Sequence, residues 1–142
     1  MCREAGRFCL AASLQLMTLA IPLAFCALLG ILAIFQVLLI IGLPLGRFAW
    51  GGQNEVLPAR LRVGSAISIL IYAAFAVVAL ARYGLAAFLP APADAVAMWV
   101  IAAYLLLSVL PNLASNSRDE RRLMVPASLV LAGLAFATAL GW

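Results

Sequence analysis

The sequence predicts an all-α membrane protein, a transmembrane four-helix bundle with a hydrophobic N-terminal extension. Two observations lead to this class. The 142 residues are 68% hydrophobic and only 10% charged. The charged residues also fall into a few short clusters, which leave four uncharged stretches: Phe8–Gly46, Val63–Ala81, Ala95–Ser117 and Leu123–Trp142. Each stretch is close to or above the roughly 20 apolar residues that a helix needs to cross a bilayer.

The first uncharged stretch is too long for one span. As a single helix, Phe8–Gly46 would measure about 58 Å, about twice the thickness of the hydrocarbon layer. It must therefore break, leave the membrane or be processed, and Pro22 and Gly30 are its weak points. We place the first span at residues 24–46 and treat residues 1–23 as an N-terminal extension of the membrane domain 24–142.

Three interpretations of the extension remain open. It has the form of a cleaved signal peptide, with Arg3 and Arg7 before an apolar core. It has the length of an additional span, but the necessary turn at Phe25–Leu29 lacks turn-forming residues. We favour an interfacial or overhanging helix, for which Met17 offers an alternative start.

The other spans are predicted at residues 63–81, 95–113 and 123–141. Pro111 and the following asparagine are expected to loosen the end of the third span. Before the fourth span, Ser117 and Glu120 have the spacing of a capping box, with Ser117 as the N-cap. Pro126 is expected in an early turn of that helix, where a missing N–H costs least.

Arginine counts predict the orientation. The loops at residues 47–62 and 115–122 carry three arginines each, whereas the loop at 82–94 carries one. The positive-inside rule places the first two loops in the cytoplasm and the C-terminus outside. Trp50 then lies at the inner interface, with Trp99 and Trp142 at the outer one. All nine basic residues are arginine, which suggests a GC-rich genome and a bacterial inner membrane.

Several classes of function are disfavoured by composition. The predicted spans contain no Asp, Glu, Arg or His, whereas a proton-coupled transporter needs an ionisable group within the membrane. The chain has no histidine, and its three cysteines lack CxxC spacing, so we predict no metal, cofactor or catalytic site. Nucleic acid is not an expected partner, because no water-facing basic stripe is available.

Three polar residues within the spans are candidate contacts: Gln36, Ser68 and Tyr72. Gln36 stands out, because a primary amide in lipid needs a partner. It would either line a solute path or form a hydrogen bond between helices, and we favour the hydrogen bond.

Polar groups also converge on the predicted cytoplasmic face. Candidate contacts for a lipid headgroup or a partner protein are Trp50, Gly51, Gly52, Gln53, Asn54, Glu55, Arg60, Arg62, Asn112, Arg118, Arg121 and Arg122. The glycine pair permits a tight turn, and Glu55 beside several arginines suggests a site for a phosphate-bearing headgroup. We favour the simpler interpretation that the arginines set topology and contact anionic lipid.

The same loop carries a recognisable pattern. It reads Gly46-Arg47-Phe48-Ala49-Trp50-Gly51-Gly52-Gln53, then Val56-Leu57-Pro58 and Leu61-Arg62. This pattern resembles a group of small bacterial multi-span membrane proteins to which no activity is attached. The resemblance extends from about Ile31 to the end of the chain and implies four spans.

These observations predict a non-enzymatic accessory or scaffold protein that acts through helix packing and its arginine-rich cytoplasmic face. Its expected partners are anionic lipid and either a second copy or another membrane protein. One alternative is a small oligomeric channel or facilitator lined by Gln36, Ser68 and Tyr72. The other is a lipid-headgroup-modifying enzyme that uses Glu55.

Overall fold

The computed structural model describes residues 2–86 and 89–141, which form helices and loops without a strand among them. The long helices are α1 (Cys2–Ile40), α2 (Ala59–Arg82), α3 (Ala93–Leu107) and α5 (Arg118–Leu140); α4 (Val109–Leu113) continues from α3. Two 3₁₀ turns, η1 (Gly46–Phe48) and η2 (Trp50–Gly52), lie between α1 and α2. Four segments are long and apolar enough to cross a membrane: Leu19–Ile40, Ala59–Arg82, Ala93–Leu113 and Arg118–Leu140. The predicted all-α four-helix fold is confirmed.

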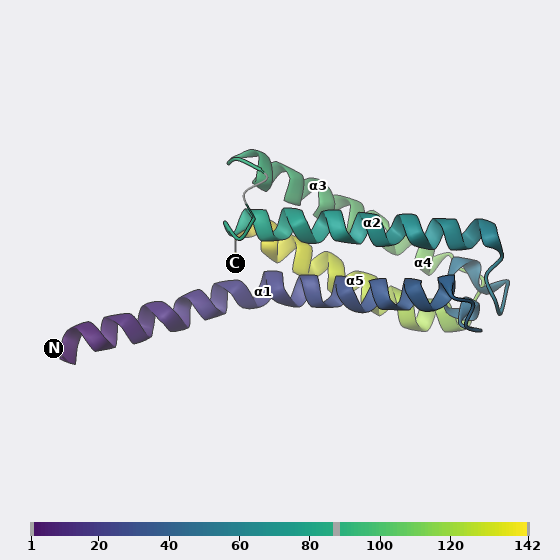
Figure 1. Ribbon diagram of the computed structural model, residues 1–142, viewed down its shortest axis with the longest axis horizontal. Coiled ribbons are helices and arrows are strands. Elements are labelled where there is room, and N and C mark those ends of the chain that lie inside the picture. Colours follow the sequence, from purple (N-terminus) through teal and green to yellow (C-terminus); the bar gives the residue numbers. More distant parts are fainter. Residues whose placement is uncertain (1, 87–88, 142) are drawn as a thin grey trace.

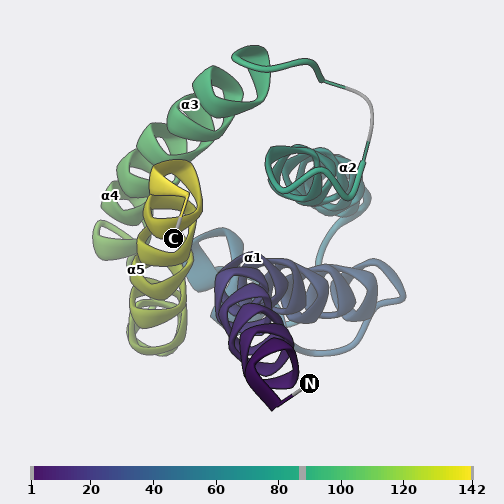
Figure 2. The same cartoon turned by 90° about the vertical axis from the view of Figure 1, so that its left-hand side faces the viewer.

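The four long helices form a closed ring of neighbours. α1 packs against α2 and α5, and α3 packs against α2 and α5 (Figures 1 and 2). Their shared core is built from Phe25 and Leu29 of α1, Ala79 of α2, Met98 of α3 and a set of small and branched residues of α5. The small side chains let the helix backbones approach closely, which is how helices associate in lipid.

The outward faces of the bundle are apolar. Side chains such as Ile34, Leu70, Val100 and Leu110 are each at least 60% exposed. A soluble monomer rarely exposes contiguous apolar surface of this kind, whereas hydrocarbon solvates it. The chain is therefore a small polytopic membrane protein.

The first helix differs from the sequence-based expectation. α1 is continuous from Cys2 to Ile40, with Pro22 inside it and no break at Gly30. It ends six residues before the predicted boundary at Gly46, because Gly42 turns the backbone into the left-handed region at φ 94°. The turn that an additional span would need at Phe25–Leu29 is not formed. Instead the N-terminal part of α1 projects beyond the other helices (Figure 1).

Two other helix boundaries differ from the predicted ones, one in the third span and one in the fourth. The third span is interrupted at Ser108, three residues before Pro111, where the loosening was predicted. Proline has no N–H, so Pro111 cannot donate to the Leu107 carbonyl four residues earlier, and the helix breaks there. α5 begins at Arg118, five residues earlier than predicted, so Pro126 lies beyond its first turn.

The two ends of the bundle differ in charge. We call the end that carries the α1–α2 and α4–α5 connections the loop end. At the opposite end, Arg82 of α2 pairs with Asp94 of α3, with Nη1 and Oδ2 3.5 Å apart. Asp94 is only 5% exposed and lies in the first turn of α3, where a negative charge is favourable. Trp99 is exposed on α3, while Trp142 lies outside the described residues.

Replacing Asp94 by asparagine is expected to lower the free energy of unfolding by about 1–2 kcal/mol, because it removes a buried partner of Arg82 and a favourable helix-terminal charge. Thermal unfolding in detergent, followed by circular dichroism, measures the effect. The matched control is Asp119→Asn. Asp119 also lies in a first helical turn and faces an arginine, but both side chains are exposed and 4.0 Å apart. Equal losses in the two variants would contradict the role assigned to burial.

Candidate functional site

The segment between α1 and α2 folds back on itself at the loop end. The Gly46 N–H donates to the Glu55 carbonyl over 2.9 Å, which closes the loop at its base. The Arg62 Nε donates to the Leu57 carbonyl over 2.8 Å. Beneath the loop, Leu57 packs in a second small core with Leu39 and Ala49. The loop is therefore a packed element of the fold.

Three consecutive residues give the loop its shape. Trp50, Gly51 and Gly52 all have positive φ, at 56°, 82° and 66°. A tryptophan in this region is strained, and its surroundings must hold it there. The Trp50 indole lies against Gly64 of α2, where an added Cβ would come within 2.6 Å of the ring. Its Nε1 donates to Ser65 Oγ over 3.3 Å.

Replacing Gly64 by alanine is expected to displace the Trp50 indole and destabilise the protein by about 1–3 kcal/mol, despite the better helix propensity of alanine. Gly133→Ala is the matched control, because Gly133 is also helical and has open space where a Cβ would lie. That control is expected to be neutral or stabilising by up to about 1 kcal/mol. Thermal unfolding of the two variants should shift in opposite directions, and a common shift would refute the argument.

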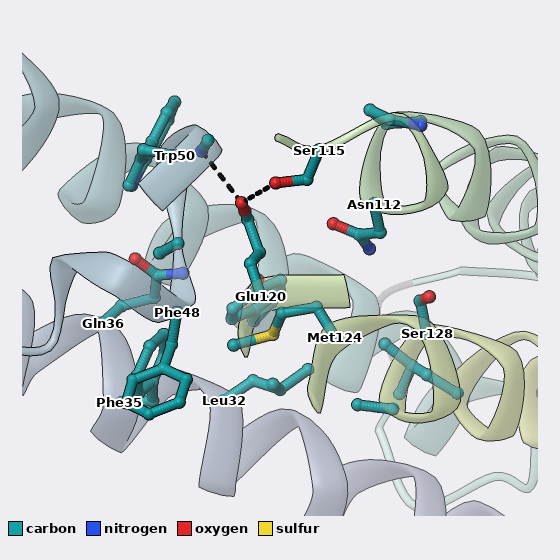
Figure 3. Close-up of a pocket in the computed structure, with 16 residues that line it drawn as sticks. Leu32, Phe35, Gln36, Phe48, Trp50, Asn112, Ser115, Glu120, Met124 and Ser128 are labelled. Carbon is teal, nitrogen blue, oxygen red and sulfur yellow. Dashed lines mark hydrogen bonds between the residues drawn. The ribbon is translucent and has the colours of Figure 1, made fainter. Parts of the chain in front are cut away.

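The turn at Trp50–Gly52 is joined to the start of α5 by hydrogen bonds, which together we call the loop–α5 junction. The Gly51 N–H donates to Glu120 Oε2 over 3.0 Å, and the Ser115 hydroxyl donates to the same oxygen (Figure 3). The Ser117 hydroxyl donates to the Arg47 carbonyl over 2.6 Å and accepts the Glu120 N–H over 3.2 Å. The junction thus connects residues about 70 positions apart.

The structure confirms half of the predicted capping box. Ser117 is the N-cap of α5, as expected. The Glu120 side chain does not return to Ser117, whose N–H donates to Ser115 Oγ instead. Glu120 is only 6% exposed and lies inside α5. Glu120 is thus a buried ionisable side chain that lies outside the predicted span 123–141, because α5 begins five residues before that span.

A cavity of about 370 Å³ lies beside the junction, between α1, the loop and α5. Its polar lining includes Glu120, Ser115, Ser128 and Asn112, together with Gln36 from the last turns of α1. Its apolar lining includes Leu32, Phe35, Phe48, Met124 and Leu131 (Figure 3). Gln36 is 9% exposed, and its Oε1 has no hydrogen-bond partner among the described residues. The cavity is thus largely apolar with a few acceptor groups, which is the usual character of a small-molecule site.

Five of the predicted site residues line this cavity: Trp50, Gly51, Asn112, Gln36 and Tyr72. Gly52 packs against Ser117, and Arg62 is tied to the loop backbone. The remaining arginines and Gln53 are exposed at the loop end. Asn54 is half-buried, and Glu55 is exposed, with only its backbone in the loop closure. Ser68 donates to the Gly64 carbonyl of its own helix over 3.0 Å.

The carboxylate at the cavity is that of Glu120, which was not among the predicted contacts. The acidic residue among the predicted contacts is Glu55, whose side chain is exposed at the loop end. A signal for Glu120 was present, because Glu120, Met124, Ala127, Ser128 and Leu131 follow helical spacing and share one face of α5. Ser115 carried no such signal, because it lies outside the helices.

Among the side chains that the structure describes, those of residues 19–86 and 89–141, no group of three or more His, Cys, Asp and Glu is placed to hold a metal ion. Neither a protein-family model nor a curated protein nor a solved structure matches the chain.

Proposed function

We propose that this chain is a non-enzymatic accessory or scaffold protein of a bacterial inner membrane, and that it binds anionic lipid or a partner membrane protein through its loop end. The observation that supports this proposal is the unequal charge of the two ends. The loop end holds six arginines and three acidic residues, a formal net charge of +3. At the opposite end Arg82 and Asp94 cancel, and Arg3, Glu4 and Arg7 at the start of α1 leave a formal net charge of +1. Such an asymmetry favours a cytoplasmic loop end.

The arginines are also well presented for binding. Exposed side chains at the loop end are those of Arg47, Arg60, Arg118, Arg121 and Arg122. The loop–α5 junction fixes the backbone of Arg47 to the start of α5, which brings arginines from two separate segments onto one surface. Each arginine near an anionic membrane surface contributes about 1 kcal/mol, so such a cluster binds lipid headgroups or an acidic partner.

The two alternatives from the sequence gain no support from the geometry. Of the three residues predicted to line a channel, Gln36 and Tyr72 line the cavity, whereas Ser68 does not and donates within α2, so the three do not form one path. A headgroup-modifying enzyme built on Glu55 would need that carboxylate in a water-excluding site, but the side chain is exposed.

The decisive experiment is crosslinking and mass spectrometry of the protein in its native membrane. The test variant combines Arg118→Gln, Arg121→Gln and Arg122→Gln; the control combines Arg3→Gln and Arg7→Gln at the far end of α1 (Figure 1). We expect the test variant to lose an enriched anionic lipid or a crosslinked partner that the control retains. Recovery of the unmodified protein with neither would overturn the proposal.

Orientation is tested by labelling single cysteines, placed at 53 or 90 in a cysteine-free background, with a membrane-impermeant maleimide. Intact cells are expected to show labelling at 90 and none at 53, because only the opposite end would face outward. The reverse pattern would remove the cytoplasmic assignment.

A further inference from the structure

We propose that the cavity beside Glu120 binds the ammonium head of an amphipathic amine, whose apolar chain lies along the hydrophobic wall. This goes beyond the proposed function, which rests on the exposed arginines. The source of the amine is either a soluble molecule or the headgroup of an amine-bearing lipid, and both present the same chemistry to the cavity.

The polar groups of the cavity favour a ligand that donates hydrogen bonds. The Glu120 carboxylate is buried and bears a formal negative charge. The Gln36 side chain interacts with Tyr72, but its Oε1, a second buried acceptor contributed by α1, has no donor within the described part of the chain. A buried acceptor without a donor is costly, so a ligand that supplies N–H groups gains free energy there. An ammonium group offers three donors and no acceptor, whereas a carboxylate or phosphate would add acceptors to acceptors.

The walls fit the rest of such a ligand. Four aromatic side chains line the cavity: Phe35, Phe48, Trp50 and Tyr72. Aromatic faces attract organic cations, most strongly where water is excluded. Leu32, Met124 and Leu131 provide an apolar surface for an alkyl chain. The volume of about 370 Å³ is that of a small-ligand pocket.

The exposed surface around the cavity would attract anions, whereas the cavity is proposed to bind a cation. The loop end has a formal net charge of +3, so non-specific binding there favours anions. A preference for a cation must therefore come from the cavity, which makes charge selectivity a sharp test.

The test uses the full-length protein in a nonionic detergent with three probes of equal chain length: octylamine, 1-octanol and octanoate. In a background with Trp99→Phe and Trp142→Phe, the fluorescence of the remaining Trp50 reports binding, because Trp50 lines the cavity. We expect octylamine to bind about tenfold or more tightly than octanol, and octanoate to bind most weakly. Glu120→Gln is expected to abolish the preference for octylamine, while Glu55→Gln, a change in the exposed carboxylate, should retain it. Octanoate binding as tight as octylamine binding, or an unchanged preference in Glu120→Gln, would overturn the proposal.

A second variant covers the case in which Glu120→Gln fails to fold, as judged by circular dichroism. Gln36→Leu keeps the carboxylate but removes the unpartnered acceptor. It is expected to weaken octylamine binding by about threefold or more and octanol binding by less, because a hydroxyl offers one donor where an ammonium offers three. Unchanged octylamine binding in this variant would overturn the proposal.

The source of the amine is identified in lipid nanodiscs. Phosphatidylethanolamine carries a primary ammonium, whereas the quaternary ammonium of phosphatidylcholine has no N–H donor. Weaker octylamine binding in phosphatidylethanolamine discs would identify the lipid headgroup as the occupant. Equal binding in the two kinds of disc would exclude the phosphatidylethanolamine headgroup and leave a soluble amine as the source. The arginine variants described above should leave all of these results unchanged, so this proposal and the proposed function can fail separately.

Discussion

Replacing Gly52 by alanine is expected to lower the free energy of unfolding by about 3 kcal/mol and to detach the loop from α5. An alanine Cβ at this position would lie 2.3 Å from the Ser117 Cβ and 2.6 Å from its Oγ. Neither atom can move aside without shifting the N-cap of α5. The backbone at 52 also has φ 66°, which adds the cost of a left-handed conformation. Thermal unfolding in detergent measures the loss, and hydrogen exchange at the Gly51 amide reports the detachment.

Gly51→Ala separates the clash from the backbone strain. Gly51 has φ 82°, but a Cβ there would meet no atom within 4 Å. This control should lose only the strain contribution of about 1–2 kcal/mol. If Gly51→Ala and Gly52→Ala unfold at the same temperature, contact with Ser117 does not determine the stability of the junction.

Replacing Glu120 by alanine is expected to cost about 2–4 kcal/mol, because the Gly51 N–H and the Ser115 hydroxyl would lose their common acceptor in a buried setting. The Gly51 amide should also exchange faster with solvent. The two measurements are thermal unfolding and amide exchange, as for Gly52→Ala.

Glu55→Ala is the matched control for Glu120. It removes the same carboxyl group from the same end of the molecule, but from an exposed side chain, so the expected change is within about 0.5 kcal/mol. Similar destabilisation in both variants would show that loss of acidic charge among the arginines matters more than the hydrogen bonds of Glu120.

The fold could be predicted because it depends on local properties of the chain. Span lengths follow from the spacing of charged residues, and the N-cap at Ser117 follows from a pattern of four neighbouring residues. The end of α1 was predicted six residues too late, at Gly46 and not at Ile40. Ile41 to Leu45 are apolar apart from their glycine and proline, so hydropathy alone does not distinguish the helix from the turn that follows it.

The cavity could not be predicted, because it depends on contacts between distant segments. Gly51 and Glu120 are 69 positions apart, and no local pattern pairs a backbone N–H with a particular carboxylate. Glu55 and Glu120 both lie near arginines in the sequence. The difference between them is that α5 turns Glu120 toward the bundle, whereas the loop turns Glu55 toward solvent.

The pairing of Arg82 with Asp94 has a consequence for how the chain enters its membrane. In the proposed orientation, the α2–α3 connection must be carried across the bilayer during biogenesis, as must the start of α1. Moving one elementary charge through a potential of about 100 mV involves about 2.3 kcal/mol of electrical work. Because the two charges cancel, the membrane potential neither pulls this hairpin across nor holds it back, and its insertion is left to the hydrophobicity of its two helices.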